Sequence, residues 1–260
     1  MITDYPRFMI DLASFGVKLD PAVAEAMAVI EEARDVRNAR PLEDLASKYA
    51  RGEVTSRNTR EQIIEAATLA AGSERIHLAA AQIENAACGT LRAWVKKNSD
   101  QIVDQLRLAF DQRAAHVAVA AHYFPPDATP AQLVAAGAAA VKAHEGLDAT
   151  LSTLNTLRSL RVEVADCAGF GADEQDATWW IAGARDAASL EHARRLFHGV
   201  GNAFHALAHA GFTLRMNTTA EAAKVAAGAQ AVSDAREAAE REAAAAEVRE
   251  SWRGIIPIAG

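Results

Sequence analysis

Apolar and polar positions recur with helical periodicity along most of the chain. In residues 195–212, for example, Phe197, Val200, Phe204 and Leu207 follow one another at spacings of three or four, which places them on one face of a helix. The same pattern predicts helices over 21–36, 41–51, 59–123, 130–165, 174–212 and 218–251. Extended patterns are confined to 160–167, which also fits a helix, and 254–260. The sequence therefore predicts an all-α fold.

Helix-start signals support several of these ranges. Asp20 and Pro21 fit the N-cap and the first helical position, where the missing N–H of proline costs nothing. Capping-box sequences begin at three threonines: Thr59, Thr129 and Thr218. The prolines of FPPDATP, residues 124–130, end one helix and start the next. This tight turn predicts that the runs 59–123 and 130–165 fold back on each other.

An uninterrupted helix over 59–123 would be about 95 Å long, since each residue rises by about 1.5 Å, and a compact domain cannot easily contain it. Either the helix breaks within KKNSDQ, residues 96–101, where Asn98 or Ser99 can cap a new helix, or the molecule is elongated. We expect an elongated helical bundle built from long antiparallel helical hairpins. The expected parts are an N-terminal short-helix segment at 1–58, a long hairpin at 59–167, a second hairpin at 168–251 and an apolar C-terminal tail at 252–260.

The composition favours close contacts between helices. Alanine makes up about a quarter of the chain and has both a small side chain and the highest helix propensity, whereas aromatic residues are only 6%. The net charge of −7 repels nucleic acid unless a basic patch is segregated on the surface, and the basic residues are spread along the sequence. We therefore expect protein partners, or a homo-oligomer, rather than a nucleic acid.

Three further features of the sequence bear on the cellular compartment of the protein. The two cysteines, Cys88 and Cys167, lie far apart without a CxxC motif, which suits a reducing environment. The first ten residues lack the basic and apolar regions of a signal peptide. Charged residues interrupt the alanine-rich runs, so we expect no membrane span. These features predict a cytoplasmic protein, or one that is assembled into a virion made in the cytoplasm.

Three histidines, His198, His205 and His209, are candidates for metal binding. At about 100° per residue they share one face of a helix, but His198 and His205 stand about 10 Å apart along its axis. Zinc–nitrogen bonds are about 2 Å long, so one ion could take only His205 and His209 from a straight helix. Because all three histidines border the apolar face of the helix, we expect them to pack at the edge of the core. A metal site and pH sensing are the alternatives.

A second metal candidate is the ExxH sequence formed by Glu74 and His77, a spacing used by di-iron sites in helical bundles. Such sites need a second ExxH, which the sequence lacks. Complete P-loop, HExxH and GxSxG motifs are absent from the sequence as well. We therefore predict no catalytic residue, no cofactor and a protein that is not an enzyme.

The adjacent residues Trp179 and Trp180 are candidates for partner contact. On a helix they would point about 100° apart, so one ring would face the core and the other a second surface. Tryptophan is enriched at the energetic centres of interfaces. The alternative is a broad core helix that neighbouring helices contact on two sides.

The run 218–251 has few large apolar residues. Val225, Val232, Ala239 and Ala246 recur every seven residues, which is typical of a narrow helix–helix seam. The helix either packs on its own bundle or pairs closely with another chain. Beyond it lie four apolar residues that would be exposed unless they dock on their own body or on a neighbour: Trp252, Ile255, Ile256 and Ile258.

These features favour a non-enzymatic structural or assembly protein that acts by self-association or by bracing a larger particle, such as a phage or prophage virion. The first alternative is a helical-bundle metal-binding protein or enzyme that uses His205 and His209. The second alternative is a regulatory binding module.

Overall fold

The computed structural model describes residues 4–39, 41–169, 176–199 and 202–253. Helices dominate these residues, and no strand occurs among them; one isolated antiparallel bridge joins Ile181 and Leu214. The all-α prediction is therefore confirmed for this part of the chain. The chain divides into two compact units, 1–98 and 99–260, each of which is described by itself below. The expected four-part division of the chain stays a prediction.

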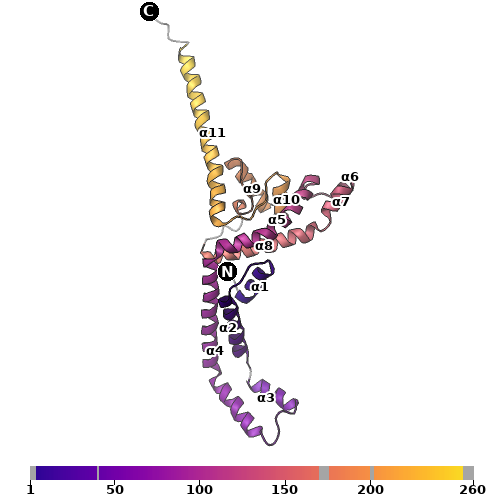
Figure 1. Ribbon diagram of the computed structural model, residues 1–260, viewed down its shortest axis with the longest axis vertical. Coiled ribbons are helices and arrows are strands. Elements are labelled where there is room, and N and C mark those ends of the chain that lie inside the picture. Colours follow the sequence, from indigo (N-terminus) through magenta and orange to yellow (C-terminus); the bar gives the residue numbers. More distant parts are fainter. Residues whose placement is uncertain (1–3, 40, 170–175, 200–201, 254–260) are drawn as a thin grey trace, which may run out of the picture. The chain divides into compact units, whose positions relative to one another are not determined.

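The first unit contains four described helices (Figure 1): α1 (Tyr5–Ser14), α2 (Pro21–Asn38), α3 (Pro41–Ala50) and α4 (Thr59–Lys97). Asp20 caps α2 as predicted, because its side chain accepts a hydrogen bond from the amide of Val23. Both α2 and α3 pack against α4. The buried side chains along these contacts include Ile30, Ala66, Ala80, Leu91 and Val95.

The predicted break near Ser99 occurs. Helix α4 ends at Lys97 with Asn98 as its C-cap, and α5 (Ser99–Tyr123) starts immediately afterwards. Asn98 stabilises this end, because its side-chain amide donates to the carbonyl of Trp94 at 2.9 Å. A single helix over 59–123 is therefore wrong. The expected capping box at Thr59 does not form either, since the N-cap is Asn58 and Thr59 donates instead to the carbonyl of Thr55.

The second unit contains the remaining elements. They are α5, α6 (Pro130–Ala135), α7 (Ala138–His144), α8 (Leu147–Ala168), the 3-10 helix η1 (Ala177–Trp179), α9 (Ala187–Gly199), α10 (Ala203–His209) and α11 (Thr219–Arg253). The predicted helix over 130–165 is thus three helices. Gly137 and Gly146 separate them with φ angles of +94° and +71°, a left-handed region that favours glycine.

The core of the second unit forms where α5 meets α8 and α10. Four aromatic rings contact one another there: Phe110, Trp180, Phe197 and Phe204. Phe110 lies 6.1 Å from Trp180 and 5.7 Å from Phe204, measured between ring centroids. Aromatic burial of this kind supplies a large part of a small core. The elongated bundle of long antiparallel hairpins is not established by these contacts and stays a prediction.

The predicted helix over 174–212 is wrong. Within the described part of this range, only η1, α9 and α10 are helical, because the backbone after Trp179 pairs with the segment that precedes α11. The amides of Arg215 and Asn217 donate to the carbonyls of Trp180 and Trp179, and the amide of Ala182 donates to Thr213. These non-local hydrogen bonds replace the local hydrogen bonds of a helix.

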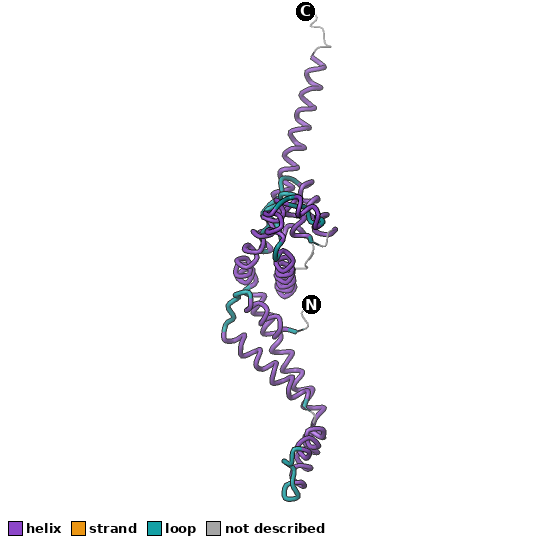
Figure 2. The backbone as a smooth tube through the Cα atoms, turned by 90° about the vertical axis from the view of Figure 1, so that its right-hand side faces the viewer, coloured by secondary structure: helices purple, strands orange, loops and turns teal. Residues whose placement is uncertain are grey.

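Helix α11 confirms the predicted helix over 218–251. The capping box at Thr218 forms, since Thr218 and Glu221 exchange backbone-to-side-chain hydrogen bonds of 2.9 and 3.3 Å. The first part of α11 packs on α9 and η1 and buries Ala222, Ala229 and Ser233. Every residue from Asp234 to Glu247 is exposed. Figures 1 and 2 show this segment, called the distal segment of α11 below, extending beyond the helices that contact the start of α11.

Candidate functional site

The three candidate histidines do not share one straight helix. Helix α9 ends at Gly199, directly after His198, and α10 begins at Ala203 with His205 and His209. Residues 200 and 201 lie outside the described residues. The angular relation that places His198 beside the other two therefore does not apply, whereas His205 and His209 remain one turn apart on α10.

His205 is buried against the ring of Phe124. Its side chain is 1% exposed, and its ring meets the ring of Phe124 edge-on with the centroids 5.3 Å apart. Phe124 also contacts His144 of α7 at 5.7 Å. Within the described part of the chain, Nε2 of His205 has no hydrogen-bond partner. Burial lowers the pKa of His205, and the nearby His209 and His144 lower it further, so the imidazole is neutral near pH 7.

His209 makes a different contact. Its Nδ1 lies 2.9 Å from the carbonyl oxygen of Ala121, near the end of α5, and the ring is exposed. Glu74 and His77 lie on α4 in the first unit, where Glu74 is exposed and His77 is half-buried. Across the described residues, no group of three or more histidine, cysteine, aspartate or glutamate side chains could hold a metal ion. Among the described side chains, the metal candidates therefore have no third ligand.

Both tryptophans of the pair are buried inside the second unit. Trp180 belongs to the aromatic core, where its ring stacks on Phe197 with the centroids 6.1 Å apart. The ring of Trp179 lies under the guanidinium of Arg161, whose Cζ is 4.0 Å from the ring centroid. The pair lies at the end of η1 rather than on an α-helix, so the expected 100° relation is replaced by two separate contacts inside the unit.

A buried polar cluster that the sequence analysis missed surrounds Arg161. This arginine of α8 is 1% exposed, and its Nε donates to the carbonyl of Asn217 at 3.0 Å. Burial lowers the pKa of Arg161 to about 10. The side-chain amide of Asn217 donates to the carbonyls of Thr178 and Ile181, at 2.7 Å each. The cluster therefore ties α8, η1 and the start of α11 together.

The burial of Arg161 could have been predicted from the sequence. Leu154, Leu157 and Val164 follow one another at helical spacing, and position 161 falls on the same face. An arginine on an apolar face signals either a buried cation or a kinked helix. Asn217 carries no comparable signal, because its partners come from residues 178 and 181, far away in the sequence.

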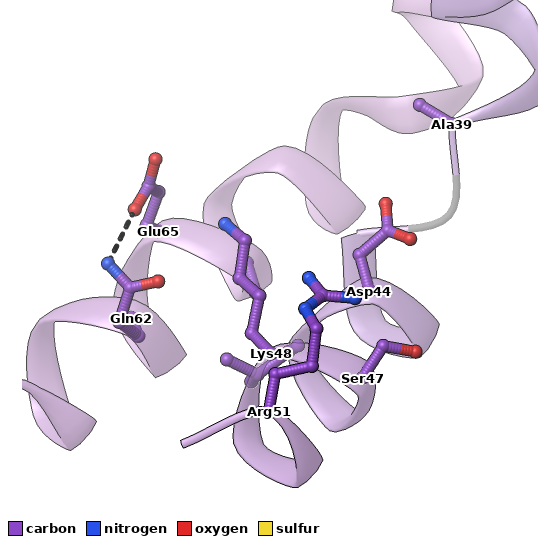
Figure 3. A pocket seen from close by; sticks show the side chains of 9 residues that line it. Ala39, Asp44, Ser47, Lys48, Arg51, Gln62 and Glu65 are labelled. Atoms are coloured by element: carbon purple, nitrogen blue, oxygen red, sulfur yellow. Dashed lines mark hydrogen bonds between the residues drawn. The ribbon is translucent and has the colours of Figure 1, made fainter. Parts of the chain in front are cut away.

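A polar cavity of about 340 Å³ lies between α3 and α4 in the first unit (Figure 3). Lys48 of α3, Arg51 directly after α3, and Gln62 and Glu65 of α4 line it. Gln62 donates to Glu65 at 3.3 Å, and Arg51 forms an ion pair with Glu53 at 2.5 Å. These side chains are exposed or half-buried and carry ordinary surface interactions. We assign no chemistry to this cavity.

The distal segment of α11 is exposed on all sides, in contrast to the packed start of that helix. Ion pairs one turn apart brace it: Arg241 with Glu237 at 3.2 Å and Arg236 with Glu240 at 3.9 Å. Of the seam candidates, Val225 is half-buried and Val232 is 51% exposed. Ile255, Ile256, Ile258 and the side chain of Trp252 lie outside the described part of the structure.

Comparisons with known proteins add no identification, because no family model, no curated protein and no solved structure matches the chain. Among the described helices, none combines the length and apolar character needed to cross a membrane.

Proposed function

We propose that the protein is a non-enzymatic helical structural protein that acts by contact with other protein chains, above all with copies of itself. The distal segment of α11, from Asp234 to Glu247, is the observation that carries this proposal, because it is helical and exposed throughout. The segment buries no side chain, and its first turn is joined to the unit by the ion pair of Arg236 with Asp186 at 3.0 Å. We therefore infer that the segment serves the protein through its exposed surface.

The physical chemistry of the segment supports a helix that stands without the rest of the unit. Alanine is the best helix former, and ion pairs at a spacing of four residues each add about 0.2–0.5 kcal/mol. Alanine side chains also let a second helix approach closely. The expected elongated arrangement of helical hairpins, the cytoplasmic location and a role in a virion belong to the same proposal.

The proposal is tested by light scattering after size-exclusion chromatography, over a range of protein concentrations. We expect the mass of the full chain to rise above that of a monomer as the concentration increases. A chain that ends at Ser233 keeps the packed part of α11 and should stay a monomer. If the full chain is a monomer at every concentration, self-association is refuted.

A further inference from the structure

The outward side of α4 is a second exposed surface, located in the first unit. At about 100° per residue, the buried residues Ala80, Leu91 and Val95 lie on one side of α4, and Ile64 and Leu78 lie on the opposite side. Ile64 and Leu78 are 57% and 61% exposed. With Ala71 they recur every seven residues, which is the spacing of a helix–helix seam. This side is called the outer face of α4 below.

The outer face is basic, although the chain as a whole is acidic. Four of the five lysine and arginine residues of α4 lie within about 60° of the line through Ala71, together with one acidic residue, Glu74. The four are Arg60, Arg75, Arg92 and Lys96. All four are exposed, and within the described residues none of them forms an ion pair. Their charge is therefore available to a partner.

The distal segment of α11 has the complementary properties. It carries five acidic and two basic side chains in the range 234–247. Ala235, Ala239 and Ala246 lie within about 40° of one another and continue the line of Val232, with Glu242 beside them. Small side chains on this seam can receive the larger Ile64 and Leu78 of α4. Glu242 is the acidic side chain within about 60° of this seam, and the segment as a whole carries a net charge of −3, so the two surfaces match in size and are opposite in the sign of their charge.

We propose that the outer face of α4 binds the distal segment of α11 from a second copy of this chain. Pairing of like with like is disfavoured, because two outer faces would bring basic side chains together and two distal segments would bring acidic ones together. A nucleic acid would use the arginines but leave Ile64 and Leu78 exposed, so a protein helix fits the face better. The inference rests on the proposed function, since it names the two surfaces that self-association uses.

This interface is heterologous, since each copy contributes a different surface. After two copies pair, one copy has a free distal segment and the other a free outer face, so association continues into open chains or closed rings. A two-fold dimer, by contrast, would stop at two copies.

Two seam variants test the interface. In the α4 variant, Arg75→Glu and Leu78→Asp place negative charge on the outer face. In the α11 variant, Ala239→Arg and Glu242→Arg place positive charge on the seam of the distal segment. All four positions are exposed, so both variants should fold as the parent chain does. Light scattering should show each variant alone as a monomer at concentrations at which the parent chain associates.

Matched controls carry the same kinds of substitution on other exposed faces. For α4 the control is Ile83→Asp with Lys97→Glu, and for α11 it is Glu237→Arg with Ala244→Arg. Both controls should associate as the parent chain does. If a control is as defective as its seam variant, the assignment of these faces is overturned.

Mixing the two seam variants separates this interface from the alternatives. The mixture contains one intact outer face and one intact distal segment, so we expect association to return, with a mass of at least two monomers. A mixture that stays monomeric, or an α4 variant that still associates alone, overturns the inference while leaving self-association itself intact. If the parent chain does not associate but binds a 30-nucleotide RNA through Arg75, the outer face is a nucleic-acid surface and the inference fails.

Discussion

Asn217 joins two separate backbone segments of the second unit, and its replacement gives a quantitative test of the buried polar cluster. In Asn217→Ala, the carbonyls of Thr178 and Ile181 each lose a hydrogen bond of 2.7 Å. Leaving a buried acceptor without its donor costs about 1–3 kcal/mol. Because Asn217 is almost fully buried, little water is available to replace the amide. For the two acceptors together, we expect a loss of about 2–6 kcal/mol in the free energy of unfolding.

Urea denaturation followed by tryptophan fluorescence measures this loss, because Trp179 and Trp180 lie beside the affected carbonyls. Asn202→Ala is a matched control, since Asn202 is exposed and its side chain makes no capping hydrogen bond to α10. The control should change the free energy of unfolding by less than about 0.5 kcal/mol. A loss below about 0.5 kcal/mol for Asn217→Ala would refute the assigned role of the amide.

Three further predictions concern the second unit. Burial lowers the pKa of His205 below the value of about 6.5 in an unfolded chain, so its stabilising contribution is complete above about pH 6.5 and is lost as the pH falls through the lowered pKa. Melting temperatures measured between pH 5 and 8 should show this loss of stability, and His205→Phe should make the loss smaller. Phe110→Ala removes the ring at the centre of the aromatic core and should cost about 3–5 kcal/mol in urea denaturation, whereas a cost below 1 kcal/mol would contradict the assigned packing. Gly146→Ala forces a side chain onto a φ of +71° and should lower the melting temperature, and an unchanged value would argue against that backbone conformation.

The sequence predicts the elements of this fold where their signals are local. The N-cap at Asp20, the capping boxes at Thr129 and Thr218 and the break at Asn98 all depend on residues within one helical turn. Gly137 and Gly146 are also local signals, and their left-handed conformations explain why the run 130–165 is divided. Gly72, Gly89 and Gly228, in contrast, lie inside continuous helices, so a glycine in a helical pattern does not by itself predict a break.

The sequence predicts less where non-local contacts decide the structure. The segment after Trp179 has a helical pattern, yet its backbone pairs with residues about 35 positions away. The role of Asn217 depends on the same pairing, so no local pattern indicates it. The seven-residue spacing of Val225 and Val232 was visible in the sequence, but which part of α11 packs internally follows only from the position of α9.

Amide hydrogen exchange of the full chain, at low and at high protein concentration, tests the central claim most directly. If copies of the chain bind through the distal segment of α11, the amides of 234–247 exchange quickly in dilute solution and slow down when the protein is concentrated. The packed residues 222–233 should change little, because α9 and η1 already cover them. Equal exchange of 234–247 at both concentrations, in a protein that associates at the higher one, would contradict the account.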